Sequence, residues 1–425
     1  MKRIFLFALL FTTWFLIIAA TLNTHWSEPI DLSADGFDGT DISCDINNVG
    51  EAVVLWNRAG GGESYAIETC FFSGNTWHTQ EQLSPIGKDA VLGDVAIDDG
   101  GNAIAAWTIK EGDNLIIQAS TYSQGTWSHP LSLSPSNGSS LYPCVVMTPS
   151  GKGLLTWKQF DSKHDTHIIY ASFYTNGSFS TPQSISDHQF NAMNPRCALS
   201  DTGEAIAVWI KDTSEGDVLQ AAIYSNGAWK APETLSSNTI NAASPNVVMN
   251  NHGVGMVIWE QLDDLHFFIH TLLYSKESWG SEHVISGAAA YMSQVALSDT
   301  GDAVAIWMQT EGIENGIQSA TYLGGSDLWS LPVVMATGKA VVSEPKVAIN
   351  GNGFAIANWL EAGVVQVSEL VSLKDNTWGT PTPISSIGQT AVDQRIEMND
   401  QGAVLALWGL FNGARWIVQS SSGTS

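Results

Sequence analysis

A tryptophan that ends a short apolar segment recurs eight times along the chain, at intervals of 48 to 52 residues. The segments SDTGEAIAVW (200–209) and SDTGDAVAIW (298–307) are nearly identical, and the other six keep the glycine, the apolar residues and the tryptophan. The eight tryptophans are Trp56, Trp107, Trp157, Trp209, Trp259, Trp307, Trp359 and Trp408. Such a repeat is typical of an architecture in which each unit buries its faces only against its neighbours.

Each unit contains four short segments with the alternating pattern of β-strands. In the fourth unit these are residues 194–200, 204–209, 218–224 and 228–236, which we call strands A, B, C and D. Turns that contain glycine link A to B, and turns of the Asn-Gly type, as in YSNGAW, often link C to D. The sequence therefore predicts that each unit is a four-stranded antiparallel meander.

A second aromatic marker opens strand D and indicates how the repeats end. It occurs in the first seven units, as Trp77, Trp127, Phe179, Trp229, Trp279, Trp329 and Trp378, whereas the last unit stops after strand C. Trp26, in WSEPIDLS, provides the eighth marker and lies 30 residues before Trp56. We therefore expect the N-terminal strand to complete the last unit, because a ring closed in this way has no free sheet edge.

With eight such units the chain resembles the β-propeller families over essentially the whole sequence after its N-terminal segment. The resemblance implies an all-β fold: a single eight-bladed β-propeller over residues 21–425, built of four-stranded antiparallel blades. SDTGEAIAVW is also similar to the Asp-box of sialidase repeats, but its step from Gly to Trp is longer. The WD-repeat and kelch signatures are absent from the sequence, so the resemblance predicts a fold and no activity.

Two repeated features are interpreted as parts of the scaffold. The strand-B tryptophans are expected to fill the space between blades, with stacking on a sugar as the alternative. A polar residue recurs on strand C, most often as glutamine (Gln118, Gln220, Gln318, Gln366 and Gln419), and Glu68, Tyr170 and His270 take its place in other units. We expect this position to make hydrogen bonds within the blade.

Residues 1–20 have the pattern of a secretory signal peptide, because Lys2 and Arg3 precede an apolar run from Ile4 to Ala20. We therefore expect a secreted or periplasmic protein with no membrane span after cleavage. An uncleaved membrane anchor is the alternative, since an apolar run of this length just spans a bilayer.

The mature chain is strongly acidic. Without Lys2 and Arg3, 15 of the 17 basic residues remain against 42 acidic ones, a net charge of −27. Such a surface repels phosphate backbones, so the composition argues against nucleic-acid binding. We expect a monomer that binds a protein or a glycan.

The four cysteines do not form an obvious disulfide framework. Cys44 and Cys70 are expected on strands A and C of one blade, with strand B between them, too far apart to be bonded. Cys144 and Cys197 are expected on the A strands of adjacent blades, where they either face each other or point apart. We interpret all four as small buried side chains, with a Cys144–Cys197 disulfide as the alternative.

Chemical variety is concentrated in the B–C loops, and no unit carries a large insertion. Because the B–C and D–A connections of a propeller share one face, this B–C/D–A loop face is the predicted binding surface. The candidate binding residues are Arg58, Lys158, Asp161, His164, His167, Glu260, His266 and Arg415. Histidine and carboxylate in one loop can bind a transition metal, and an ordinary solvated loop is the alternative.

Four aspartates lie close together in DLSADGFDGTD, the segment expected to connect strand D of the last blade to strand A of the first. They are Asp31, Asp35, Asp38 and Asp41. Carboxylate oxygens are the ligands that calcium prefers, so this segment is a candidate calcium site.

The favoured interpretation is a secreted, non-enzymatic β-propeller scaffold that binds a protein or a glycan through its B–C/D–A loop face. One alternative is a calcium-dependent lectin. The other is a sialidase-like glycoside hydrolase, because three of Arg58, Arg196, Arg395 and Arg415 could meet at the channel mouth. No residue is predicted to be catalytic.

Overall fold

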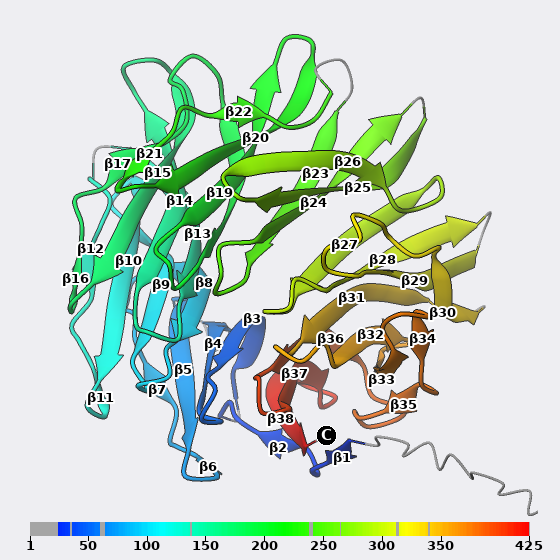
Figure 1. Ribbon diagram of the computed structural model, residues 1–425. Coiled ribbons are helices and arrows are strands. Elements are labelled where there is room, and N and C mark those ends of the chain that lie inside the picture. Colours follow the sequence, from blue (N-terminus) through cyan, green and yellow to red (C-terminus); the bar gives the residue numbers. More distant parts are fainter. Residues whose placement is uncertain are drawn as a thin grey trace, which may run out of the picture.

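The computed structural model describes residues 24–34, 36–59, 64–136, 138–237, 241–263, 265–311, 314–338 and 341–424. These residues form eight antiparallel sheets arranged in a ring, the predicted eight-bladed β-propeller (Figure 1). Over the same ranges, no helix is long and apolar enough to cross a membrane. The predicted signal peptide lies outside the described residues.

Each blade has the predicted order of strands from the channel outward. Strand A of blades 1 to 8 is β3 (Asp38–Ile46), β8 (Ala90–Ile97), β13 (Ser140–Met147), β18 (Ala192–Leu199), β23 (Ala242–Met249), β27 (Ala290–Leu297), β31 (Val342–Ile349) and β36 (Ala391–Met398). Strand B is β4 (Ala52–Ala59), β9 (Ala103–Glu111), β14 (Gly153–Asp161), β19 (Ala205–Thr213), β24 (Gly255–Asp263), β28 (Ala303–Glu311), β32 (Ala355–Glu361) and β37 (Ala403–Phe411). Strand C is β5 (Ala66–Ser73), β10 (Asn114–Ser123), β15 (Thr166–Thr175), β20 (Gly216–Ser225), β25 (His266–Ser275), β29 (Glu314–Tyr322), β33 (Val364–Ser372) and β38 (Trp416–Thr424).

The outermost strand D is short and in most blades interrupted. In blades 1 to 7 it consists of β6 (Thr76–Trp77) with β7 (Glu81–Gln82), β11 (Thr126–Trp127) with β12 (Leu131–Ser132), β16 (Ser178–Phe179) with β17 (Gln183–Ser184), β21 (Ala228–Trp229) with β22 (Glu233–Thr234), β26 (Ser278–Val284), β30 (Val333–Gly338), and β34 (Thr377–Trp378) with β35 (Thr382–Pro383). Where strand D is interrupted, the outer edge of the blade has few consecutive ladder bonds, which limits pairing with other chains.

The N-terminal segment closes the ring, as predicted. β1 (His25–Trp26) and β2 (Ile30–Asp31) pair with β38, with Trp26 opposite Gly423 and Asp31 opposite Gln419. A side chain at Gly423 would clash, because its Cβ would lie 2.3 Å from a methyl carbon of Thr24. Figure 1 shows the C-terminus beside β1, so the first and last described strands lie together.

The strand-B tryptophans form the packing between blades. All eight are 0% exposed, which excludes sugar stacking on these indoles. Trp107 of blade 2, for example, lies in one apolar cluster with Leu55 and Ile67 of blade 1. The predicted hydrogen bonds of the strand-C polar position are present in several blades. The indole N–H of Trp56 donates to Glu68 and that of Trp408 to Gln419, while Gln118 and Gln220 donate to Ser132 and Thr234 of strand D in their own blades.

The A–B turns require the glycine that recurs six residues before each tryptophan. Gly203 and Gly301, the glycines of the two nearly identical segments, have φ of +88° and +84°. Residues with a Cβ rarely adopt this conformation, so the turn explains the fixed step from Gly to Trp.

Every strand A carries a β-bulge near its start that the sequence did not predict. In each blade one residue of the bulge has a positive φ, between 48° and 57°. The eight residues are Asp41, Leu92, Tyr142, Asn194, Ser244, Met292, Glu344 and Asp393. In blade 4, for example, the register shifts between Met193 and Arg196. A bulge re-aims the side chains beside it, and here it directs strand-A residues at the entrance of the central channel.

Candidate binding site at the mouth of the central channel

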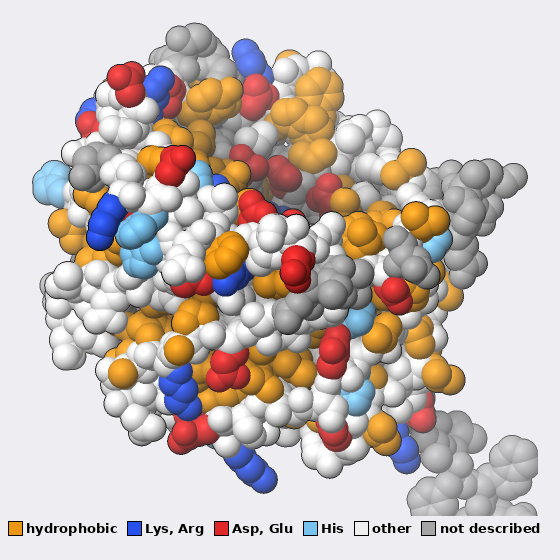
Figure 2. Space-filling model, turned by 90° about the horizontal axis from the view of Figure 1, so that it is seen from above, with side chains coloured by type: hydrophobic (Ala, Val, Ile, Leu, Met, Phe, Trp, Pro, Cys, Tyr) orange, Lys and Arg blue, Asp and Glu red, His pale blue; other side chains and the backbone are white. Residues whose placement is uncertain are grey.

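The A strands enclose two adjoining cavities along the channel. One has a volume of about 730 Å³ and is lined by bulge residues near the starts of the A strands, among them Asn194 and Glu344, which places it at the B–C/D–A face. The other, of about 490 Å³, extends toward the ends of the A strands at Met249 and Met398. Figure 2 shows acidic side chains around a hollow near the centre of one face of the molecule.

Three cationic side chains line the larger cavity although the protein as a whole is acidic. They are Arg196 on β18, Lys346 on β31 and Arg395 on β36. The lining also contains carboxyl and amide side chains, which are Glu344, Asp393, Glu397, Asn194, Asn246 and Gln294. A cavity with this lining can pair with an anionic group and exchange hydrogen bonds with hydroxyl groups.

The acidic groups deeper in the channel are desolvated. Burial raises the pKa of Glu397 to about 8, and repulsion from Asp45 adds to this rise. Burial likewise raises the pKa of Asp45 to about 7, although its carboxylate accepts hydrogen bonds from the backbone N–H groups of Ile97 (2.9 Å) and Ile46 (2.8 Å). Burial lowers the pKa of Lys346 to about 8, and the charge of Arg395 lowers it further. At neutral pH the cavity therefore contains a protonated carboxyl group, Glu397, beside cationic side chains.

These raised pKa values predict that stability falls as pH rises. The ordinary pKa values of Asp45 and Glu397 are 3.8 and 4.5, whereas in the folded protein they are about 7 and about 8. The folded state therefore binds more protons than the unfolded chain between about pH 4 and pH 8, and its free energy of unfolding should decrease across this window. Glu397→Gln should flatten the decrease, because an amide does not ionise.

Urea unfolding at a series of pH values would measure this effect. Glu233→Gln, at an exposed position on β22, is the control and should keep the pH dependence of the wild type. If Glu397→Gln and the wild type lost stability equally across this pH range, the desolvated carboxyl would not be responsible.

Two of the arginines predicted as binding residues form ion pairs and do not line the larger cavity. Arg58 lies 3.2 Å from Glu68, measured from Nε to Oε1, and its guanidinium lies 4.4 Å from the ring centroid of Phe37. Arg415 lies 3.0 Å from Asp38, measured from Nη1 to Oδ2. Neither lines the larger cavity, so the suggested meeting of three arginines at the channel mouth is wrong: Arg196 and Arg395 are present there, and the third cation is Lys346.

Lys158 and Glu260 also have local partners. The Lys158 ammonium lies 5.2 Å from the ring centroid of Tyr142, and burial lowers its pKa. Glu260 is buried and accepts a 2.8 Å hydrogen bond from the backbone N–H of Met292, the bulge residue of the next blade. Glu260 therefore holds the bulge backbone at the channel mouth in place by this hydrogen bond.

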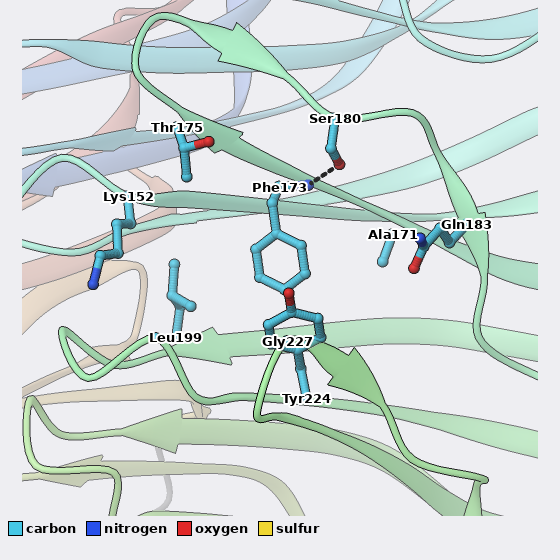
Figure 3. Close-up of a pocket in the computed structure, with 10 residues that line it drawn as sticks. Lys152, Ala171, Phe173, Thr175, Ser180, Gln183, Leu199, Tyr224 and Gly227 are labelled. Atoms are coloured by element: carbon cyan, nitrogen blue, oxygen red, sulfur yellow. Dashed lines mark hydrogen bonds between the residues drawn. The ribbon is translucent and has the colours of Figure 1, made fainter.

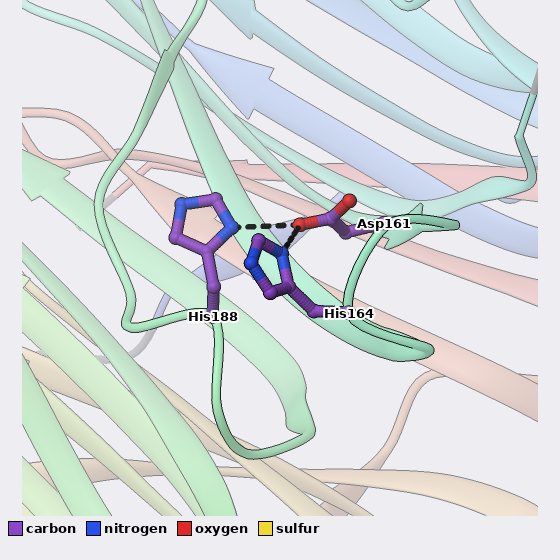
Figure 4. Close-up of side chains that lie close together, drawn as sticks. All are labelled: Asp161, His164 and His188. Carbon is purple, nitrogen blue, oxygen red and sulfur yellow. Dashed lines mark hydrogen bonds and ion pairs between the residues drawn. The ribbon is translucent and has the colours of Figure 1, made fainter.

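The histidine-containing B–C loops of blades 3 and 5 differ in which side chains they bring together. In blade 3, Asp161 and His164 meet a third side chain, His188, which lies in the D–A connection between β17 and β18 (Figure 4). His167 does not join them: its ring packs against Phe160 at 5.3 Å between centroids, and burial lowers its pKa. In blade 5, His266 is exposed at the start of β25.

The candidate calcium segment is spread over two strands, not held in one loop. Asp31 belongs to β2 and accepts a hydrogen bond from Gln419, while Asp38 and Asp41 belong to β3 and have Arg415 and Asn57 as partners. Asp35 lies outside the described residues. Within the described ranges, the single group of three His, Cys, Asp or Glu side chains with ligand atoms within 4.8 Å of one another is Asp161, His164 and His188. The calcium site stays a prediction.

The cysteines are buried, as expected, and all four are free. Cys44 and Cys70 both pair with Val54, on opposite sides of β4, so strand B separates them. Cys144 and Cys197 face each other across the interface of blades 3 and 4, with their sulfur atoms 3.6 Å apart. This resolves the orientation that the sequence left open.

A further cavity, of about 360 Å³, lies between blades 3 and 4 away from the channel (Figure 3). Phe173 on β15 and Tyr224 on β20 form its aromatic wall, with 4.3 Å between ring centroids. The same contact occurs between Phe71 and Tyr122 of blades 1 and 2, at 4.5 Å. We therefore assign these rings to the packing between blades.

The fold and the channel define an eight-bladed β-propeller with a polar cavity at its mouth. No protein-family model matches the chain, and no curated protein matches its sequence. Among solved structures, it is similar to the polysaccharide lyase Uly1, with 10% identity over 88% of this chain and 87% of that chain and a TM-score of 0.50.

Two further structures are similar over most of their length. One is a protein of unknown function from Dyadobacter fermentans, with 12% identity over 94% of this chain and 99% of that chain and a TM-score of 0.47. The other is the Aleuria aurantia lectin in complex with Fucα1-6GlcNAc, with 13% identity over 84% of this chain and 100% of that chain and a TM-score of 0.41. At these identities the likeness concerns the fold alone.

Proposed function

We propose that the protein is an exported, glycan-binding β-propeller that holds an acidic sugar residue at the channel mouth on its B–C/D–A face. The observation that carries this proposal is the convergence of Arg196, Lys346 and Arg395, from three different blades, on one cavity. Besides burial, Arg395 and Arg196 both lower the pKa of Lys346, so these cations repel one another, and Glu344 and Asp393 offset this in part. An anionic ligand would relieve the repulsion further.

The rest of the cavity favours a sugar over a simple inorganic anion. Its volume of about 730 Å³ is that of a pocket for a small molecule, and Asn194, Asn246 and Gln294 add amide groups that both donate and accept hydrogen bonds. A sugar carries hydroxyl groups around its whole ring, and a uronic or sialic acid adds one carboxylate. Such a ligand matches both the cations and the amides.

Glycan-array screening followed by calorimetry would test the proposal. We expect binding of oligosaccharides that contain uronic or sialic acid and not of their neutral analogues. Arg395→Gln or Lys346→Gln should weaken this binding about tenfold or more, because each removes a charged hydrogen-bond donor. Arg415→Gln is the matched control, since this arginine pairs with Asp38 and does not line the cavity.

Two outcomes would contradict the proposal. One is equal affinity for acidic and neutral oligosaccharides. The other is an acidic-glycan affinity that Arg395→Gln, Lys346→Gln and Arg415→Gln all leave unchanged.

Glycoside cleavage is a second candidate function, favoured by Glu397. This carboxyl lines the same cavity, and burial raises its pKa to about 8, so it is mostly protonated at neutral pH, which is the state required of a general acid. Release of fluorophore from sialosides and other fluorogenic glycosides, abolished by Glu397→Gln, would support an enzyme. Binding of glycosides without their cleavage would instead support a lectin-like scaffold.

A further inference from the structure

The side chains of Asp161, His164 and His188 converge although they come from two different connections. Asp161 ends β14 and His164 lies in the tight B–C turn that follows, while His188 comes from the D–A connection that leads to β18. The Nδ1 atoms of both imidazoles point at one carboxylate oxygen of Asp161, at 2.6 Å from His164 and 2.8 Å from His188 (Figure 4). All three ligand atoms lie within 4.8 Å of one another.

The surrounding contacts hold this arrangement in place. The hydroxyl of Thr166 donates a 3.0 Å hydrogen bond to the backbone carbonyl of His188, which ties the D–A connection to the start of β15. The neighbouring Asp187 pairs with Lys211 of blade 4 at 2.8 Å. The second oxygen of Asp161 accepts a 3.0 Å hydrogen bond from the backbone N–H of Lys163, so the carboxylate is oriented as well. Partners of this kind fix the direction of metal ligands in known sites.

We propose that Asp161, His164 and His188 bind a divalent transition-metal ion, with zinc as the best match. Two imidazole nitrogens and one carboxylate oxygen are a ligand set typical of zinc sites that keep a further position open. The side chains of His164 and His188 are 38% and 40% exposed, so an ion can enter from solvent and water can take the open position. The site lies on blade 3 and is separate from the channel cavity, whose lining contains none of the three residues.

Blade 5 provides a matched comparison within the same chain. Asp263 and His266 follow Trp259 by four and seven residues, the same steps by which Asp161 and His164 follow Trp157. The next connection, residues 285–289, reads ISGAA and contains no histidine or carboxylate. Blade 5 therefore repeats the sequence spacing of the first two ligands, although His266 lies on β25 opposite Asp263 and not in the turn, and it lacks the third.

Titration of tag-free, metal-stripped protein with zinc chloride and with cobalt chloride would test this site. We expect one ion to bind per chain, with cobalt giving the visible absorption of a low-coordinate N,O site. His188→Ala should weaken zinc binding at least about tenfold, and His164→Gln, a change in an exposed turn, should do the same if His188→Ala fails to fold. His266→Ala should leave the affinity unchanged.

The proposal is overturned if the wild type binds no zinc or cobalt in the micromolar range. It is also overturned if His266→Ala weakens binding as much as His164→Gln, since the ion would then be bound by scattered surface histidines. A rise in melting temperature with zinc that His164→Gln abolishes would support the site independently of any ligand at the channel.

Discussion

Deleting residues 21–33 is expected to lower the melting temperature sharply and to make the protein associate. The deletion removes β1 and β2, the buried side chain of Leu32, and Trp26, which packs against the clusters of blades 7 and 8. Loss of two large apolar side chains costs about 2–5 kcal/mol each, which is a large part of the stability of a typical domain. The deletion also exposes the edge of β38, and exposed strand edges pair with other chains.

Thermal unfolding and size-exclusion chromatography would measure both effects. Ile30→Ala is the control within the same segment, because this side chain is 50% exposed and should cost little. A truncated protein that melts like the full chain and stays monomeric would show that the terminal strand does not close the ring.

Trp107→Ala is expected to have the largest effect of any single substitution on strand B of blade 2, about 3–5 kcal/mol. The indole is 0% exposed and lies between blades 1 and 2, so its removal leaves a cavity that two rigid sheets cannot fill by moving together. Trp127→Ala, at the partly buried strand-D marker of the same blade, should cost less.

Urea unfolding of the two variants would compare these costs in one blade. Equal losses of stability for Trp107→Ala and Trp127→Ala would contradict the assignment of the strand-B tryptophans as the packing element between blades.

The fold was predictable because its determinants repeat. The strand-B tryptophan and the turn glycine recur in every unit, and the 30-residue step from Trp26 to Trp56 identified the closing strand. The bulge of strand A was not predictable in the same way. Leu92, Tyr142 and Met292 adopt a positive φ that costs such residues about 1–2 kcal/mol, so the surrounding sheet imposes a conformation that their side chains do not favour.

The candidate site was predictable only in part. Asp161 and His164 belong to one variable B–C loop and could be predicted together. His188 belongs to a separate connection, and only the fold brings it close to the other two. Among the cations of the channel, Arg196 and Arg395 were candidates from the sequence, whereas Lys346 was not predicted, although the repeat carries a signal for it. Arg196, Lys346 and Arg395 each lie 13 residues before their strand-B tryptophan, so they occupy the same position in three blades and had to point into the same channel.

The pairing of β1 and β2 with β38 also determines when the protein can finish folding. Trp26 and Gly423 are partners from opposite ends of the chain, so blade 8 cannot be completed until the last residues have been synthesised. Until then blade 1 and the most recently formed blade each have one face without a neighbour, and contacts of such long sequence separation form slowly. We therefore expect the growing chain to depend on chaperones that cover open blade surfaces during synthesis.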